Sequence, residues 1–437
     1  MVEQIAFILV LLTAAYFLTR RISFIRRNIL LGKKIEIKDQ PGKRLRNLLL
    51  VAFGQKKMFK RPLPAFLHLF VYVGFLVINI EVLEFMIDGV AGTHRVFSPY
   101  LGSFYTVLMN IFEFLAVGVL LSCIIFLIRR NVIKVPRFWT REMTRWPRLD
   151  ANIILLTEIL LMVAILAMNA SDQLLQATGG AYPRTGRLVF SSALIPLFAS
   201  VPTPGLVWVE RFAWWFHIVG ILAFAVYITY SKHLHIFMAF PNTWYAKLAP
   251  SGKMSPMPVV TNEVKIMLGT AGDANAQAAE PGRFGAKDVN DLSWNMLMAA
   301  YSCTECGRCT ARCPAHQTGK RLSPRKIMMD TRDRMEEVGE SLLKGGPGLN
   351  DGKTLLNDYI SKEEINACTN CQACVDACPV LIDPLEIINE LRRFVSMEES
   401  GAPSSWNNMF QNIETNFAPW KFSPADRFNW AKEIQDN

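Results

Sequence analysis

The sequence predicts an all-α protein, in which a bundle of five membrane-spanning helices precedes a smaller, cysteine-rich helical domain. Three observations lead to this fold class. Five stretches are apolar and near the length of roughly 20 residues needed to cross about 30 Å of hydrocarbon. They cover residues 4–19, 65–87, 104–128, 151–170 and 211–231. Eight of the nine cysteines lie in two copies of one motif after residue 300, and segments with the alternation typical of strands are almost absent.

The chain divides into four parts. Residues 1–245 hold the five spans, and residues 246–290 are rich in Pro, Gly, Ala and Ser without a sustained apolar period, which is typical of a linker. Residues 291–400 hold the cysteine motifs. Residues 401–437 form an aromatic-rich tail, which either packs against its own domain or docks a partner.

The first span is the shortest and resembles the apolar core of a signal peptide. Four arginines follow it within the next eight residues, and no small-residue cleavage site does. We therefore expect an uncleaved membrane anchor. The stretch 188–201 is too short to span a bilayer and is interrupted by Pro196, so we expect it at the outer face.

Loop charges predict the orientation of the bundle. Residues 20–62 carry fourteen Lys and Arg residues and residues 129–149 carry seven, whereas 88–103 carry one and 171–210 carry two. Positive loops stay on the cytoplasmic side, so the N-terminus is expected outside and the cysteine-rich domain in the cytoplasm, at the inner membrane of a bacterium. A reducing cytoplasm also suits free thiols.

The net charge of +10 does not indicate nucleic-acid binding. From residue 251 onward 20 Lys and Arg face 25 Asp and Glu, a balance of −5, and the membrane half carries 27 against 12. The positive-inside rule and anionic lipid headgroups explain that excess. We expect no nucleic acid among the partners.

Both cysteine motifs have the spacing C-x2-C-x2-C-x3-C-P, by which bacterial ferredoxins bind [4Fe–4S] clusters. Three closely spaced thiolates bind one cluster, and the fourth, just before the proline, binds the other. The first cluster is expected on Cys303, Cys306, Cys309 and Cys378, and the second on Cys368, Cys371, Cys374 and Cys313. Zinc is the weaker alternative, because this doubled order is not typical of zinc sites.

Histidines in the spans indicate a haem. His217 and His235 are eighteen residues apart, so on one continuous helix they would share a face about 27 Å apart. His68, near the cytoplasmic start of the second span, would lie at the depth of His235. A membrane-buried imidazole requires a partner, and haem iron accepts one from each side. We predict a b-type haem between His68 and His235, with hydrogen bonding between helices as the alternative.

The sequence leaves a second, outer haem open. His217 would be one ligand, but the position about ten residues beyond His68, where a facing ligand would lie, is Ile78. His94, in the loop after the second span, is the remaining outer candidate, because Gly89 and Gly92 would let that loop fold back.

Four acids also fall within the spans. Glu81, Glu84 and Glu113 lie in outer halves and Glu158 in an inner half. Ionisable groups inside a membrane are costly and mark proton paths or ligand sites. We interpret these acids as candidates for a proton path or a quinone contact, with solvation at helix ends as the alternative.

Two parts of the chain resemble known families. WWFHIVGILAFAVYITYSKHLHI, with His217 and His235, is similar to the last haem-bearing helix of the nitrate reductase gamma subunit and of the cytochrome b subunit of membrane-bound heterodisulfide reductase. FLHLFVYVGF, with His68, resembles their second helix, and Ile78 departs from their two-haem pattern. CTECGRCTARCPAHQTGKRLSPRKI and CTNCQACVDACPVLIDP resemble the heterodisulfide reductase C-type subunit and the iron–sulfur proteins of glycerol-3-phosphate and lactate dehydrogenases.

These resemblances imply an oxidoreductase subunit, a cytochrome b domain fused to a ferredoxin domain. Such a subunit would pass electrons between a cytoplasmic redox partner, two [4Fe–4S] clusters, haem b and the (mena)quinone pool. Relatives often continue into CCG domains after a segment like NFAPWKFSPADRFNWA, so we expect a CCG-domain protein or an electron-transfer flavoprotein as a separate partner.

Substrate chemistry is expected on that partner chain. The chain has no GxGxxG motif, and the GGPG at 345–348 follows no strand, so neither a flavin nor a nicotinamide site is predicted. Two alternative functions remain. The chain would be the membrane half of an electron-transfer-flavoprotein:quinone reductase, or a redox-sensing or structural anchor in a larger membrane complex.

Overall fold

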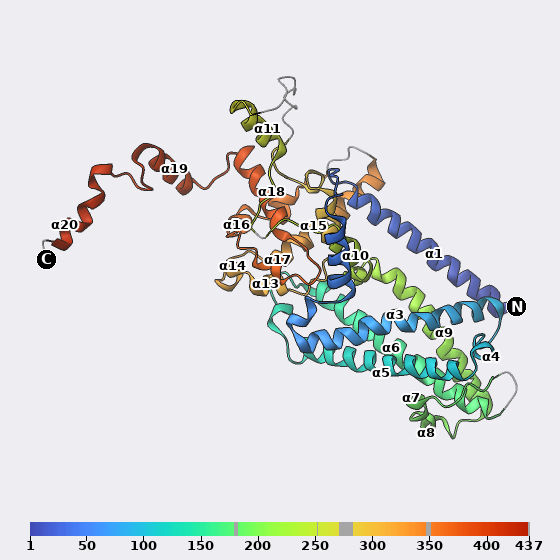
Figure 1. The fold of residues 1–437 in the computed structure, drawn as a ribbon. Coiled ribbons are helices and arrows are strands. Elements are labelled where there is room, and N and C mark those ends of the chain that lie inside the picture. The colour runs from blue at the N-terminus through green and yellow to red at the C-terminus, as the bar shows by residue number, and fades with distance from the viewer. Residues whose placement is uncertain (179–181, 251, 271–282, 347–350, 436–437) are drawn as a thin grey trace.

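The computed structural model describes residues 1–178, 182–250, 252–270, 283–346 and 351–435. Long helices form a bundle, and a group of short helices covers one end of it (Figure 1). Within the described ranges there is no strand, only isolated bridges between Lys33 and Ser293 and between Leu356 and Ile360. The predicted all-α class is therefore confirmed for this part of the chain.

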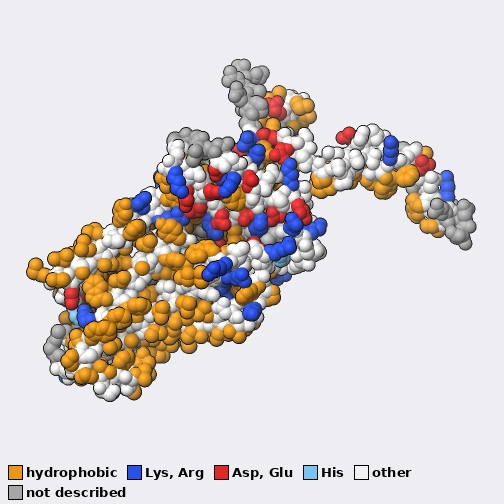
Figure 2. Space-filling view, turned by 180° about the vertical axis from the view of Figure 1, so that it is seen from behind, with side chains coloured by type: hydrophobic (Ala, Val, Ile, Leu, Met, Phe, Trp, Pro, Cys, Tyr) orange, Lys and Arg blue, Asp and Glu red, His pale blue; other side chains and the backbone are white. Residues whose placement is uncertain are grey.

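All five predicted spans are helices that are long and apolar enough to cross a membrane. They are α1 (Val2–Ile29), α3 (Pro62–Ala91), α5 (Ser103–Asn131), α6 (Arg145–Gln176) and α9 (Thr203–Ile228). Figure 2 shows apolar side chains over most of the visible face of the bundle, with charged side chains gathered towards the smaller domain. A wide apolar surface of this kind is what a helix bundle in lipid requires.

Each helix is longer than the apolar stretch that predicted it, and α1 shows why. Its second half leaves the apolar belt and packs on the smaller domain. Asn28 is fully buried and donates a hydrogen bond to the Tyr301 hydroxyl at 3.0 Å, and Arg21 forms an ion pair with Glu336 at 2.7 Å. These polar contacts with the smaller domain stabilise α1 beyond its apolar stretch. Hydropathy does not predict this extension, because it depends on tertiary packing.

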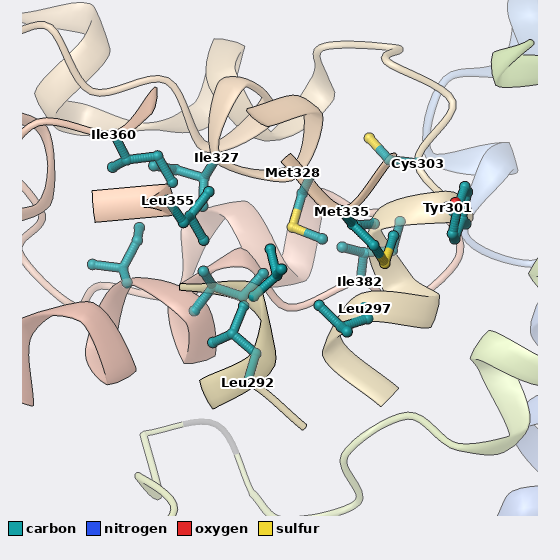
Figure 3. Close-up of a cluster of buried hydrophobic side chains, with 14 of the residues drawn as sticks. Leu292, Leu297, Tyr301, Cys303, Ile327, Met328, Met335, Leu355, Ile360 and Ile382 are labelled. Carbon is teal, nitrogen blue, oxygen red and sulfur yellow. The ribbon is translucent and has the colours of Figure 1, made fainter. Parts of the chain in front are cut away.

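The cysteine-rich domain is built from short helices around one apolar core. Its elements are α12 (Trp294–Tyr301), α13 (Arg308–Arg312), α14 (Pro314–Gln317), α15 (Pro324–Gly345), α16 (Lys362–Asn366), α17 (Ala373–Ala377) and α18 (Pro384–Met397). Figure 3 shows core side chains such as Leu297, Ile327 and Leu355, with Cys303 at the margin of the same cluster. Ser323 caps α15 by accepting a hydrogen bond from the Lys326 amide, as expected of a serine at an N-cap.

Shorter elements connect these two parts. On the proximal side, which we define as the end of the bundle next to the cysteine-rich domain, are α2 (Pro41–Asn47), a π-helical turn (Leu48–Phe53) and α10 (His235–Trp244). On the distal side, the opposite end, are α4 (Ser98–Leu101), α7 (Val189–Ser192) and α8 (Ile195–Phe198) (Figure 1). The stretch 188–201 thus forms two short helices and no span.

The predicted linker and the tail also contain helices. The segment 246–290 includes α11 (Pro258–Met267), which its composition did not predict, while residues 271–282 and the end of the GGPG turn lie outside the described residues. In the tail, α19 (Ser404–Asn416) and α20 (Asn429–Gln435) extend away from the body of the protein (Figure 1). Apolar side chains of α19, such as Trp406, Phe410 and Ile413, are exposed.

Candidate metal centres

The two cysteine motifs have the same backbone conformation. The residue before α13, Gly307, has φ +69°, and its counterpart before α17, Gln372, has φ +61°. Both helices end on a cysteine in extended conformation, Cys313 with φ −73° and ψ 119° and Cys378 with φ −73° and ψ 124°. The left-handed residue turns each chain sharply between its cysteines, and the extended cysteine, followed by proline, turns away from its own motif.

Because α13 packs against α17, the two motifs exchange their last cysteines. One small cavity is lined by Cys303, Cys306, Cys309 and Cys378. The other is lined by Cys313, Cys368, Cys371 and Cys374. Each cavity thus has the three close cysteines of one motif and the fourth of the other, the grouping that the spacing predicts. We call the first set the proximal cysteines. We call the second set the distal-motif cysteines, because they lie farther from the bundle, although both sets belong to the cysteine-rich domain and neither lies at the distal end of the bundle.

A zinc ion and a four-iron cluster place different demands on four cysteines. Among the described residues, no group of three or more His, Cys, Asp or Glu side chains is close enough to hold one metal ion. A tetrahedral zinc ion needs all four sulfurs about 2.3 Å from one centre. A four-iron cluster binds each cysteine through a different iron.

Burial keeps the thiols of Cys303, Cys309 and Cys378 protonated when no metal is bound. It raises the pKa of Cys303 to about 12 and the pKa of Cys378 to about 11, the latter with a further contribution from Cys306. Thiolates rather than thiols bind metal, so iron must displace protons from these cysteines as the site fills. Such a pocket favours a strongly bound cofactor over a free reactive thiol.

The two cysteine groups differ in their surroundings. The proximal group adjoins the bundle, since Arg137 donates a hydrogen bond to the Cys306 carbonyl at 3.0 Å and Asn242 donates one to the Val380 carbonyl at 2.6 Å. In the distal-motif group, Cys371 is exposed to solvent. One group therefore faces the membrane helices and the other faces outward.

The structure brings His68 of α3 and His235 of α10 together. Their ring centres are 6.4 Å apart. A first-row metal ion holds an imidazole nitrogen at about 2 Å, so two imidazoles sharing one iron place their ring centres roughly 6 to 6.5 Å apart. His235 Nδ1 lies 3.2 Å from the Lys232 carbonyl oxygen. That contact fixes the tautomer with a free Nε2, as in many metal-ligating histidines. The pair therefore fits the axial ligands of a haem.

The prediction that His217 and His235 lie on one continuous helix is wrong. The helix α9 ends at Ile228, and His235 begins the separate helix α10. Asp150 of α6 causes the break, because it accepts hydrogen bonds from the Tyr227 hydroxyl at 2.5 Å and the Ser231 hydroxyl at 2.6 Å. These bonds hold Ser231 in extended conformation between the two helices.

The structure does not bring His94 to His217. Both ring nitrogens of His94 are engaged, Nε2 by Asp172 at 3.1 Å and Nδ1 by Arg211 at 3.1 Å. His217 instead bonds through Nδ1 to the Leu161 carbonyl oxygen at 2.9 Å, and its Nε2 is buried without a partner. The free Nε2 of His217 could still bind a ligand, but His94 has no free nitrogen with which to bind the same iron.

Three of the four predicted acids gather at the distal end. Glu84 accepts hydrogen bonds from the Tyr105 hydroxyl at 2.6 Å and the Phe97 amide at 2.9 Å. Glu113 accepts one from Asn169 at 3.1 Å, and Glu81 is buried with Oε1 unpaired. Glu158 does not belong to this group and lies near Cys123 in the proximal half.

Arg95 organises this distal network, and sequence reasoning missed it. Its side chain is 5 % exposed and donates hydrogen bonds to Asp172 at 2.7 Å, Asn169 at 2.7 Å and the Tyr105 hydroxyl at 3.2 Å. The available signal was that Arg95 is the single cation of its loop. A buried arginine in a membrane protein requires such partners.

A second buried network joins the histidine pair to the proximal cysteines. Glu305, between Cys303 and Cys306, forms ion pairs with Lys232 and with Arg332, the latter at 2.8 Å. Burial alone would raise the pKa of Glu305, but these two cations hold it below its usual range. The network lines a cavity of about 1450 Å³ at the junction of the bundle and the domain, and it fixes the domain on the bundle.

Comparison with known proteins agrees with the cysteine geometry. Residues 302–382 match the family model of the 4Fe-4S dicluster domain. Over 96 % of its length the chain is 26 % identical to a probable iron-sulfur-binding oxidoreductase, FadF, of Bacillus subtilis. Over 99 % it is 26 % identical to EtfAB:quinone oxidoreductase of Syntrophomonas wolfei. These alignments cover 59 % and 60 % of the two relatives, so the chain spans about three-fifths of their length.

A shorter match concerns one third of the chain. Over 34 % of its length the chain is 29 % identical to a probable membrane-anchored ferredoxin of Chromohalobacter salexigens, of which the match covers 24 %. No solved structure gave a significant match. With five apolar helices among the described residues and a match to the dicluster domain, the chain is similar to membrane-anchored iron–sulfur electron-transfer proteins. The class that these relatives support is an oxidoreductase subunit.

Proposed function

We propose that this chain conducts electrons between a cytoplasmic redox partner and a membrane quinone, through two [4Fe–4S] clusters and a b-type haem. The observation that carries this function is the order of the candidate centres. The exposed Cys371 marks the group nearest to solvent, and the proximal cysteines come next. The His68–His235 pair follows, because Arg308 of the first cysteine motif is within electrostatic range of His68. Protein side chains do not accept electrons at ordinary potentials, so such a path requires resident cofactors.

The charges between the proximal cysteines and the histidine pair suit this transfer. Arg308, within the first cysteine motif, lies within electrostatic range of His68 and donates a hydrogen bond towards the Lys57 carbonyl. Lys57 is itself close to Cys378 and Asp376. Cations beside a cluster stabilise its more negative, reduced form. A bound haem would supply one-electron redox chemistry, and His68 and His235 would hold it.

The distal-motif group and the tail would receive the soluble partner. The exposed side of this group and the exposed apolar residues of α19, which include Trp406 and Phe410, lie away from the bundle. The relatives are longer than the alignments, so further domains of theirs lie outside the compared region. We propose a CCG-domain protein or an electron-transfer flavoprotein as partner, with the domain on the cytoplasmic side of a bacterial inner membrane.

One observation favours the second of these partners. The relative that aligns over 99 % of this chain is named EtfAB:quinone oxidoreductase. The alternative function, the membrane half of an electron-transfer-flavoprotein:quinone reductase, therefore has direct support from similarity. Adding purified electron-transfer flavoprotein in its reduced form to the membranes should reduce the haem if that partner is correct.

The test of the conduit is a redox titration of the full chain in membranes. A short-chain hydroquinone should reduce the haem, and the oxidised quinone should reoxidise it. A haem that responds to dithionite but not to either quinone form would contradict the conduit and favour the structural or sensing anchor.

A further inference from the structure

Several buried side-chain atoms of the bundle helices have no hydrogen-bond partner, and two of them, Glu81 Oε1 and His217 Nε2, belong to groups that can take up a proton. Glu81 is 3 % exposed and His217 is 1 % exposed, and neither atom has a hydrogen-bond partner. Leaving a buried polar atom unpaired costs about 1–3 kcal/mol, and more for a charged group. Such atoms mark sites where a ligand completes the bonding.

Aromatic side chains frame the His217 imidazole. The Phe85 ring lies 5.7 Å from it, edge to face, and the Trp214 ring lies 6.1 Å from Phe85. Phe7 of α1 is 5.7 Å from Trp214. Glu81 precedes Phe85 by four residues on α3, so both side chains lie on the same face of that helix. A flat, aromatic ligand with polar groups on its ring suits these surroundings.

Glu81 also lies at the inner end of a polar chain that reaches the distal surface. Arg95 is within electrostatic range of Glu81 and donates a hydrogen bond to Asp172. Asp172 contacts His94 at 3.1 Å, and His94 contacts Arg211 at 3.1 Å. The side chains of His94 and Arg211 are 19 % and 32 % exposed, so the chain ends at solvent.

We propose that Glu81 and His217 bind the ring of the quinone and exchange its protons with the distal face along the Arg95 network, in which Asp172 and His94 can carry a proton and Arg95, which stays protonated, holds Asp172 in place. The inference rests on the conduit function proposed above, and it assigns a site and a membrane side to the quinone. It also assigns the free nitrogen of His217 to the quinone and not to a second haem.

The tautomer of His217 determines the chemistry. Its Nδ1–H donates to the Leu161 carbonyl, so Nε2 accepts a hydrogen bond from one hydroxyl of a hydroquinone. The Glu81 carboxylate accepts one from the other hydroxyl. Oxidation breaks both O–H bonds, and one proton goes to each side chain. The two electrons pass singly to the centres of the conduit, and quinone reduction reverses each transfer.

Two variants test the site in the full chain in membranes. Glu81→Gln keeps the shape and removes the carboxylate, and His217→Gln removes the base. We expect both to slow haem reduction by duroquinol at least tenfold, with unchanged haem content and unchanged reduction by dithionite. Glu3→Gln is the matched control, because Glu3 is exposed at the same end of the bundle, and it should keep the original rate.

Three results would overturn the inference. The first is an unchanged duroquinol rate in both variants, and the second is loss of a haem from His217→Gln. The third is the appearance of protons from duroquinol on the cluster-domain side of sealed vesicles. If duroquinol fails to reduce the haem of the unmodified chain, the conduit itself fails and the inference fails with it, so the two failures can be told apart.

Discussion

At the scale of single residues, the histidines show what spacing can and cannot predict. His68 and His235 come together as expected, although the eighteen-residue helix that suggested their depth is interrupted. The interruption comes from Asp150, a residue of another helix, whose contact with Ser231 the local sequence does not report. His94 is an outer candidate by loop geometry alone, and its actual partners, Asp172 and Arg211, lie far away in sequence.

The haem ligands can be tested by single substitutions. Replacing either His68 or His235 by alanine should abolish the same b-haem absorption, because one iron requires both imidazoles. Difference spectra of dithionite-reduced membranes measure this, and His316→Ala, in the short helix α14 after the first motif, is the control. Retention of the full spectrum in either variant would contradict the pairing.

A pH effect is expected from Asp383, the N-cap of α18. Burial, with the nearby Glu386, raises the pKa of Asp383 to about 6, against 3.8 normally. Between these values the folded chain binds more protons than the unfolded chain, so the stability that Asp383 contributes falls as the pH rises through this window.

Asp383→Asn should remove this pH dependence. The amide oxygen can still accept hydrogen bonds from the Leu385 and Glu386 amides, so the cap is kept. Thermal loss of the cluster absorbance, measured at about pH 5 and about pH 7, should differ less in the variant than in the original chain. An equal or larger difference in the variant would contradict the assignment to Asp383.

At the scale of elements, the spans and the cysteine grouping were predictable because both depend on local spacing. Four of the five apolar stretches fall within α1, α3, α5 and α6, and the fifth, 211–231, overlaps α9, which ends at Ile228. The missed features are tertiary. The extension of α1 to Ile29 depends on contacts with α12 and α15, and the Arg95 network depends on α3, α5 and α6 meeting at the distal end.

The contact between α1 and α15 is tight enough to test. A Cβ atom added at Gly339 would lie 2.1 Å from the Asn28 Oδ1 atom. Gly339→Val should therefore push the two helices apart and destabilise their contact by about 1–3 kcal/mol. Limited proteolysis of membranes should release the cysteine-rich domain faster. Glu340→Val, at an exposed neighbouring position, should not change the rate.

At the scale of the whole molecule, cofactor content tests the dicluster assignment. Two [4Fe–4S] clusters require about eight cluster iron atoms and about eight sulfide ions per chain. Anaerobic preparations of the full chain should approach these values, with haem iron counted separately. A sulfide content of about four would mean a single cluster. In Cys371→Ser we expect the cluster of the distal-motif cysteines to be lost more readily than the cluster of the proximal cysteines, since Cys371 is exposed and belongs to the first of these sites.

The packing of α1 on the cysteine-rich domain has a consequence for biogenesis. The ribosome makes α1 before the cysteine-rich domain, and α1 then forms part of the surface on which that domain packs, through Asn28 and Tyr301. We therefore expect the cysteine-rich domain to reach its final position only after α1 is inserted in the membrane and the helices between them have packed together. Iron binding and packing of the domain on the bundle are then separate steps. A chain without its first thirty residues should still bind iron at its cysteines, but its cysteine-rich domain should pack only weakly on the bundle.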